Sequence, residues 1–328
     1  MKQIKVLKQA LTVTLLAGVA VQAGAQVPAP ATTLIVNAIP GVVAAGTKVE
    51  LIKEGFSGTE GPVGLADGSL IFTETQVNRI TRIWPDGTVT GFLDNTNGAN
   101  GLGFTPNGDL YAVQVQRTRV GIIHPSTHAK TLTEGFEGKP FGRPNDLVVD
   151  KKGNVYFTDS GANGALPPGA PEPAKPAVYR ISSSGEVKRL ASDVERPNGI
   201  QLSPDDKVLY VANTNGEHVL AYDIAADGSV GPKRQFAKLE VIEKTSNGGV
   251  NSGADGLAVD DAGRVYVASN KGIEIFSSKG EALGSITLPK KPQNLAFAGP
   301  DKKTLYAVGR GAAYRFPVLT AGVSGRAK

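Results

Sequence analysis

A motif that recurs six times constrains the fold of this chain more than any other feature. Each copy begins with an acidic or carboxamide residue, usually followed by Gly or Leu, and continues through an apolar stretch and a turn to an aromatic residue. The leading polar residues are Glu60, Asn100, Asn145, Asn198, Asp255 and Asn294. The aromatic residue follows 11 or 12 positions later, and successive copies start 39 to 57 residues apart. Repetition at this period is typical of β-propellers.

The composition supports an all-β chain. Glycine (41 residues) and proline (21 residues) are frequent, and short β-branched and aromatic runs recur between turn residues. We predict a single-domain, six-bladed β-propeller over residues 48–328, after an N-terminal extension over residues 26–47. The last copy lacks a fourth strand, whereas residues 48–53 alternate polar and apolar side chains. We expect this segment to complete the last blade and cover an otherwise exposed edge.

The first 25 residues have the layout of a secretory signal peptide. Three lysines lie within the first eight positions, residues 10–20 are apolar or small, and Ala23-Gly24-Ala25 suits a cleavage site. The alternative is a membrane anchor, but an apolar stretch of 11 residues is too short to cross a bilayer. We therefore expect export, with the mature protein periplasmic or secreted after cleavage near Ala25.

Charge and cysteine content exclude several classes of function. The formal net charge is +5, of which three charges belong to the leader, and no Lys/Arg run follows, so no nucleic-acid partner is predicted. The chain has no cysteine, which excludes disulfides, thiolate zinc sites and a cysteine nucleophile. No later segment has the length of a membrane span. A small molecule is the expected partner, and the sequence makes no prediction of the oligomeric state.

The leading polar residues suggest a metal site. The innermost strands of a propeller line its central channel, so equivalent residues of different blades converge there. A cluster of carboxylates is costly to bury unless a cation compensates it, and Ca²⁺ prefers six to eight oxygen ligands. The absence of His and Cys from the set disfavours Zn²⁺ and Cu²⁺. At any single position a turn-forming residue is the simpler interpretation, but six oxygen-bearing residues in six copies favour a shared ion.

Several motifs occur in an order that resembles the gluconolactonase and senescence-marker-protein (regucalcin)-like family of six-bladed propellers. The resemblance extends over residues 50–316, and its main motifs are Glu60-Gly61-Pro62-Val63, Arg143-Pro144-Asn145-Asp146-Leu147, Arg196-Pro197-Asn198-Gly199-Ile200 and Asp255-Gly256-Leu257-Ala258-Val259-Asp260. It implies a lactonase that depends on one divalent cation, with Ca²⁺ expected and Mg²⁺, Mn²⁺ and Zn²⁺ as alternatives. The implied metal ligands are Glu60, Asn145, Asn198 and Asp255, and the implied substrate-binding residues are Asn100, Arg143 and Asn145.

The hypothesis that follows is metal-assisted hydrolysis of a small ester, such as a sugar lactone. Asp255 is the candidate catalytic residue, as a general base, a group that positions water, or a nucleophile. Asp146 is expected either to orient Asn145 or to form a hydrogen bond at the start of its strand. Two other functions remain open: an exported, non-catalytic binding or scaffold propeller with a structural metal, and a phosphotriesterase or aryl esterase. Residues 161–176 are expected to form a surface loop or a lid over the site.

Overall fold

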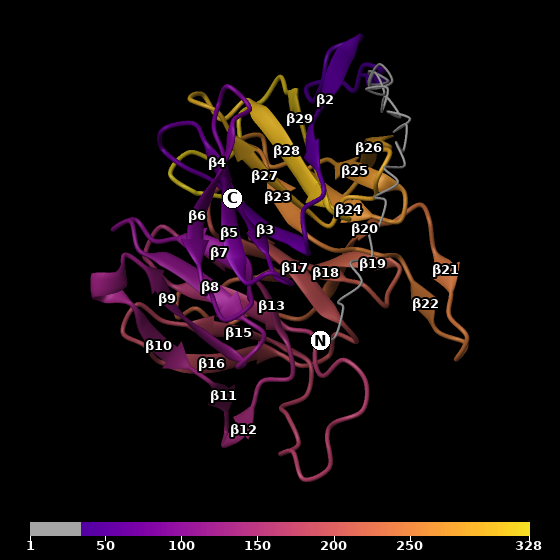
Figure 1. Ribbon diagram of the computed structural model, residues 1–328. Coiled ribbons are helices and arrows are strands. Elements are labelled where there is room, and N and C mark those ends of the chain that lie inside the picture. Colours follow the sequence, from indigo (N-terminus) through magenta and orange to yellow (C-terminus); the bar gives the residue numbers. More distant parts are fainter. Residues whose placement is uncertain (1–33) are drawn as a thin grey trace, which may run out of the picture. The chain divides into compact units, whose positions relative to one another are not determined.

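The structure is a computed structural model that describes residues 34–328. Its strands form six antiparallel sheets around a central axis, which confirms the predicted six-bladed β-propeller (Figure 1). The predicted signal peptide, residues 1–25, lies outside the described residues. None of the helices among residues 34–328 is long and apolar enough to cross a membrane.

Each of the first five blades has four strands that follow one another in sequence from the axis outward. Blades 1 to 3 comprise β3 (Thr59–Gly64), β4 (Leu70–Glu74), β5 (Arg79–Ile83) and β6 (Val89–Asp94); β7 (Ala99–Phe104), β8 (Leu110–Gln114), β9 (Arg119–His124) and β10 (Lys130–Thr133); and β13 (Pro144–Val149), β14 (Val155–Asp159), β15 (Ala177–Ile181) and β16 (Val187–Ala191). Blades 4 and 5 comprise β17 (Pro197–Leu202), β18 (Val208–Asn213), β19 (His218–Asp223) and β20 (Arg234–Lys238); and β23 (Leu257–Val259), β24 (Val265–Ser269), β25 (Gly272–Phe276) and β26 (Ala282–Ile286).

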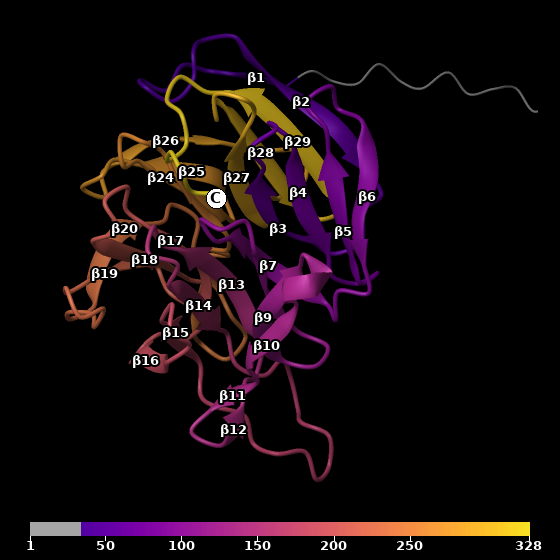
Figure 2. The same ribbon diagram turned by 90° about the vertical axis from the view of Figure 1, so that its left-hand side faces the viewer.

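The sixth blade joins the two ends of the described chain. It comprises, from the axis outward, β27 (Asn294–Ala298), β28 (Thr304–Gly309), β29 (Ala312–Pro317), β2 (Thr47–Glu54) and β1 (Leu34–Val36). The antiparallel pairing of β2 with β29 confirms that a segment preceding the first repeat closes the ring (Figure 2). Glu50 receives two hydrogen bonds from the Arg315 guanidinium, at 2.7 and 3.0 Å. Strand β1 was not predicted; it comes from the predicted extension and adds a fifth strand to this blade.

Three short elements lie outside the blades: the 3-10 helix η1 (Ser126–His128) and two hairpins of two-residue strands. The hairpins are β11 (Gly135–Phe136) with β12 (Lys139–Pro140), and β21 (Glu243–Lys244) with β22 (Val250–Asn251).

The repeating aromatic residue packs between neighbouring blades. Tyr156 of blade 3 lies in a hydrophobic cluster with Ile200 of blade 4, and Tyr266 of blade 5 lies edge-on to Phe297 of blade 6, with ring centroids 5.2 Å apart. Phe72 of blade 1 instead clusters with Tyr306 of blade 6. The 11- to 12-residue interval therefore places the aromatic residue at an interface between blades.

The glycine of the repeat allows the innermost strands to approach one another. A Cβ atom at Gly199 would overlap the backbone carbonyl oxygen of Asp255 in the next blade. A Cβ atom at Gly61 would overlap the Asn100 carbonyl oxygen in the same way. A glycine follows the leading polar residue in four copies, at Gly61, Gly101, Gly199 and Gly256. The glycine therefore narrows the ring and brings the polar residues of adjacent blades together.

Replacing Gly199 with Ala is expected to lower the free energy of unfolding by about 1–3 kcal/mol, because an added methyl group forces packed backbones apart. Gly91→Ala is the matched control, since Gly91 lies in the outer strand β6 and a Cβ atom there meets nothing within 4 Å. Urea unfolding of both variants and the wild type measures the difference. Equal midpoints for the two variants would contradict this packing role.

Candidate metal centre

The leading polar residues lie at the beginning of the innermost strands. Glu60, Asn100, Asn145, Asn198 and Asn294 occupy the first or second position of β3, β7, β13, β17 and β27, respectively, and Asp255 lies two residues before β23. The innermost strands of adjacent blades contact one another around the complete ring. The structure thus brings the predicted metal ligands of four different blades to the same end of the channel.

The six leading polar residues together form a polar ring at this end of the channel, and direct hydrogen bonds connect several of its members. The Asn100 side-chain nitrogen donates to the Asn145 carbonyl oxygen at 2.7 Å and to its side-chain oxygen at 3.3 Å. The Asn294 nitrogen donates to a Glu60 carboxylate oxygen at 3.4 Å, and the Gln293 nitrogen donates to the other at 3.1 Å. Blades 2 and 3, and blades 6 and 1, are therefore linked through their leading residues.

Two carboxamide oxygens of the ring lack a partner. The side-chain oxygens of Asn100 and Asn198 are buried and accept no hydrogen bond from any residue in the described range 34–328. Their orientation is fixed from the nitrogen side, because Asn198 donates to the Thr214 hydroxyl at 3.1 Å while that hydroxyl donates to the Ala254 carbonyl oxygen at 2.7 Å. Buried acceptors without a partner carry a free-energy cost. A cation bound to such an oxygen would remove this cost, which no described residue of the protein removes.

The carboxylates of the ring are held under electrostatic strain. Burial and the negative charge of Asp146 raise the pKa of Glu60 to about 7. Burial, Glu60 and Asp146 raise the pKa of Asp255 well above its usual range, against the opposing effect of Lys291 and Arg310. Both shifts indicate that neighbouring positive charges do not fully compensate the carboxylates, and a divalent cation would lower both pKa values because it stabilises the charged forms.

These donors suit a hard divalent cation. The ring offers two carboxylates and carboxamide oxygens, which are the ligands that Ca²⁺ and Mg²⁺ prefer. Nowhere between residues 34 and 328 do three or more His, Cys, Asp and Glu side chains gather in a metal-binding cluster. A site on this axis therefore depends on the carboxamides Asn145 and Asn198 as well as on Glu60 and Asp255.

Arg143, the predicted substrate contact, is held beside the ring by a buried carboxylate. Asp159 accepts hydrogen bonds from the backbone N–H groups of Gly142, Arg143 and Gly161, at 2.8, 2.6 and 3.0 Å. The guanidinium of Arg143 is close enough to Glu60 to lower the pKa of that carboxyl. Asp159 thus positions both Arg143 and the first residue of the long loop that follows.

The loop over residues 161–176 is largely exposed and is tethered at few points. Asn163 accepts a hydrogen bond from Arg196 at 2.7 Å, and Glu172 forms an ion pair with Lys139 at 2.9 Å. The Ala174 N–H donates to the Pro140 carbonyl oxygen at 2.8 Å, so the loop lies beside the β11–β12 hairpin (Figure 1).

Sequence reasoning assigned no role to Gln293 or Lys328, and it left the role of Asp146 open. One Asp146 oxygen accepts the N–H of Leu147 at 2.9 Å, which is the hydrogen bond expected at a strand start. The other oxygen accepts from Asn294 at 3.2 Å and from the Lys328 ammonium group. Asn294 directs its nitrogen at Glu60 and Asp146, and its oxygen accepts the Leu295 N–H at 2.9 Å, so it connects the ring rather than offering it a free ligand.

The fold and the site define a class of protein: six-bladed β-propellers that carry oxygen-bearing side chains around one end of the axis. Residues 58–309 match the model of the family described as SMP-30/Gluconolactonase/LRE-like region, and the chain belongs to that family. The resemblance inferred from the ordered motifs is therefore confirmed.

Characterised relatives and solved structures agree with this assignment. The chain is 28% identical over 280 residues to a gluconolactonase of Zymomonas mobilis subsp. mobilis, covering 79% of this chain and 78% of the relative. It is 26% identical over 260 residues to pentonolactonase XacC of Haloferax volcanii, covering 77% and 81%. A solved gluconolactonase structure from Xanthomonas campestris superposes with a TM-score of 0.75 at 26% identity, covering 87% of this chain and 94% of that one.

Proposed function

We propose that this protein hydrolyses small lactones, with sugar lactones as the substrate class and one divalent cation, Ca²⁺, as the cofactor. The observation that carries the proposal is the pair of Asn100 and Asn198 oxygens, which have no partner among residues 34–328, in the same ring as the carboxylates of Glu60 and Asp255, whose pKa values are raised. The names of the relatives, a gluconolactonase and a pentonolactonase, support the substrate class.

The residues of the ring divide the work between binding and proton transfer. Glu60, Asn145, Asn198 and Asp255 would hold the cation, which supplies stabilisation of the negative charge that develops on the lactone carbonyl oxygen. Asp255 positions the attacking water and accepts its proton as the new C–O bond forms. The ester C–O bond of the lactone then breaks, and the proton passes to the departing alkoxide, which gives the open-chain hydroxy acid.

Two further residues orient the substrate in this proposal. Arg143 projects positive charge and hydrogen-bond donors toward the ring. The side-chain oxygen of Asn100, which accepts no hydrogen bond within residues 34–328, accepts one from a hydroxyl group of the lactone or from the attacking water.

The test is a hydrolysis assay of the purified protein with gluconolactone, other aldonolactones, aryl esters and a phosphotriester. We expect acid release from the lactones to stop with chelator and to return when Ca²⁺ is restored, and parallel titrations with Mg²⁺, Mn²⁺ and Zn²⁺ identify the preferred ion. Turnover unaffected by chelation would contradict the cation requirement. Turnover of esters or phosphotriesters alone would overturn the substrate class. A silent panel with a cation-dependent melting temperature would instead identify a non-catalytic binding propeller.

A further inference from the structure

The segment over residues 321–328 crosses the end of the channel opposite the polar ring. The Ala327 carbonyl oxygen accepts the N–H of Gly64, the last residue of β3, at 2.7 Å. Arg326 donates to the carbonyl oxygens of Leu202 and Ser203 at 2.7 and 2.9 Å and forms an ion pair with Asp206. Since β3 and β17 begin at the ring and end at these contacts, the segment lies at the far end of both strands.

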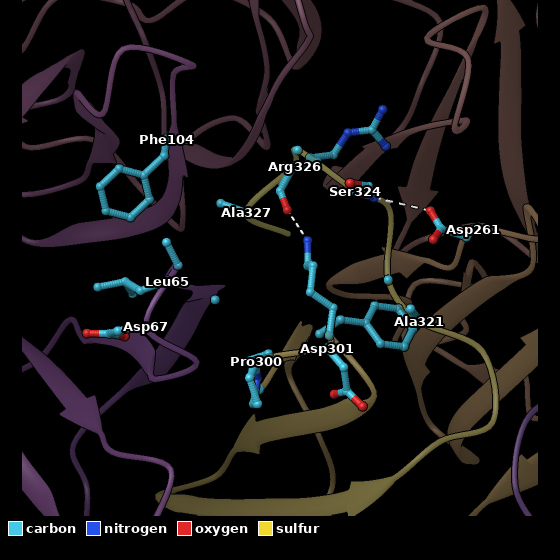
Figure 3. Close-up of a pocket in the computed structure, with 18 of the residues that line it drawn as sticks. Leu65, Asp67, Phe104, Asp261, Pro300, Asp301, Ala321, Ser324, Arg326 and Ala327 are labelled. Atoms are coloured by element: carbon cyan, nitrogen blue, oxygen red, sulfur yellow. Dashed lines mark hydrogen bonds between the residues drawn. The ribbon is translucent and has the colours of Figure 1, made fainter.

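A pocket of about 880 Å³ marks this end of the molecule. Figure 3 shows Ser324, Arg326 and Ala327 along its wall, with the Ser324 N–H bonded to Asp261 of blade 5 at 3.1 Å. The segment therefore contacts blades 1, 4 and 5 at the end remote from the candidate metal centre, and this pocket is not part of that centre.

Lys328 extends from this segment to a carboxylate beside the ring. Its ammonium group donates to Asp146, and the two side chains are only 2% and 1% exposed. The same Asp146 oxygen accepts from Asn294, whose nitrogen also donates to Glu60. Two hydrogen bonds thus connect the carboxylate that holds Lys328 to a predicted metal ligand.

This contact changes the charge on the axis. Glu60, Asp146 and Asp255 interact with one another electrostatically, and together they bring three negative charges when all are ionised, as cation binding requires. Lys328 offsets one of them, which leaves two for a divalent cation. A buried carboxylate without such a partner is strongly unfavourable, so the ammonium group stabilises the protein when the cation is absent. The same positive charge opposes the arrival of a second cation nearby.

We propose that Lys328 is an internal counter-cation that sets the affinity of the axial centre for divalent cations. It is a positioning residue, because it acts through Asp146 and Asn294 and does not touch the substrate. The inference rests on the proposed cation site but not on the proposed reaction. In this arrangement Lys328 replaces part of the charge compensation that a cation would otherwise supply, and it weakens binding of that cation in return.

The test is calorimetric titration of Ca²⁺ into four chelator-stripped proteins: wild type, Lys328→Met, Asp146→Asn and the double variant. We expect Lys328→Met to melt at a lower temperature without Ca²⁺ and to bind Ca²⁺ about tenfold more tightly, whereas Asp146→Asn binds it about tenfold more weakly. The double variant, with two axial charges as in the wild type, returns toward wild-type affinity. If Lys328→Met does not fold, the difference in Ca²⁺ affinity between Asp146→Asn and the double variant still measures the effect of the Lys328 charge.

Arg326→Met is the matched control, because it removes a second buried cation of the same segment without changing the axial charge. We expect this variant to melt earlier and to keep the wild-type affinity for Ca²⁺. Equal affinity of wild type and Lys328→Met, or an equal change in Lys328→Met and Arg326→Met, would overturn the inference. Absence of Ca²⁺ binding in every protein, wild type included, would instead remove the proposed cation site and this inference with it.

Discussion

Replacing Asp255 with Asn is expected to lower kcat for lactone hydrolysis about a thousandfold at saturating Ca²⁺. The carboxamide keeps the shape of the side chain and one oxygen ligand, but it cannot accept a proton from the attacking water. Asp255→Ala removes the ligand as well, so we expect it to abolish cation-dependent turnover. Initial rates of acid release, measured over a range of lactone and Ca²⁺ concentrations, separate the two effects.

Asp227→Asn is the control for this experiment. Asp227 lies on an exposed turn of blade 4 and bonds to Ser229 of the same turn, so the change of charge alone should leave kcat unaltered. If Asp255→Asn weakens Ca²⁺ binding but retains the wild-type kcat once Ca²⁺ is saturating, Asp255 is a ligand and not a base. Unchanged turnover in Asp255→Ala would contradict both roles.

The repeat predicted the architecture because each of its residues has a separate physical task. The leading polar residue begins the innermost strand, the following glycine permits close approach of the next blade, and the aromatic residue packs between blades. The strand that closes the last blade was also predictable, since alternation over residues 48–53 is a local pattern; it spans Thr47–Glu54 in the structure. Strand β1 is only three residues long, and β11, β12, β21 and β22 are each two, so they are too short to produce a periodic signal.

The convergence of the leading polar residues was predictable from the sequence, but their hydrogen bonding was not. Nothing in the residue order distinguishes Asn198, whose side-chain oxygen has no partner in the described part of the chain, from Asn294, whose side-chain oxygen accepts a backbone N–H. The orientation of each carboxamide depends on partners in other blades, such as Thr214 and Asn145. Lys328 is 182 positions from Asp146 in the sequence. Their contact occurs once and is not part of the repeated motif, so the sequence pattern could not predict it.

In the presence of a chelator, the protein is expected to lose stability as the pH rises from about 4.5 to about 7. The pKa of Glu60 is about 7 in the folded protein and 4.5 for the ordinary side chain. Between these values the folded state holds a proton that the unfolded state has released, so the free energy of unfolding falls with pH by on the order of 3 kcal/mol. Asp255 and Asp159, whose pKa values burial also raises, act in the same direction.

Addition of Ca²⁺ should reverse this dependence, because the ion binds the deprotonated carboxylates and stabilises the folded state according to its affinity. The measurement is the melting temperature from pH 4.5 to 8, with chelator and with saturating Ca²⁺; we expect the two curves to diverge as Glu60 ionises. Glu60→Gln is the control, since it removes one carboxyl group with a raised pKa and one candidate ligand together, and should make the chelated curve less steep while reducing the gain from Ca²⁺. A chelated protein that becomes more stable between pH 5 and 7 would show that the carboxylates are already compensated by the protein alone, and the physical case for an axial cation would fail.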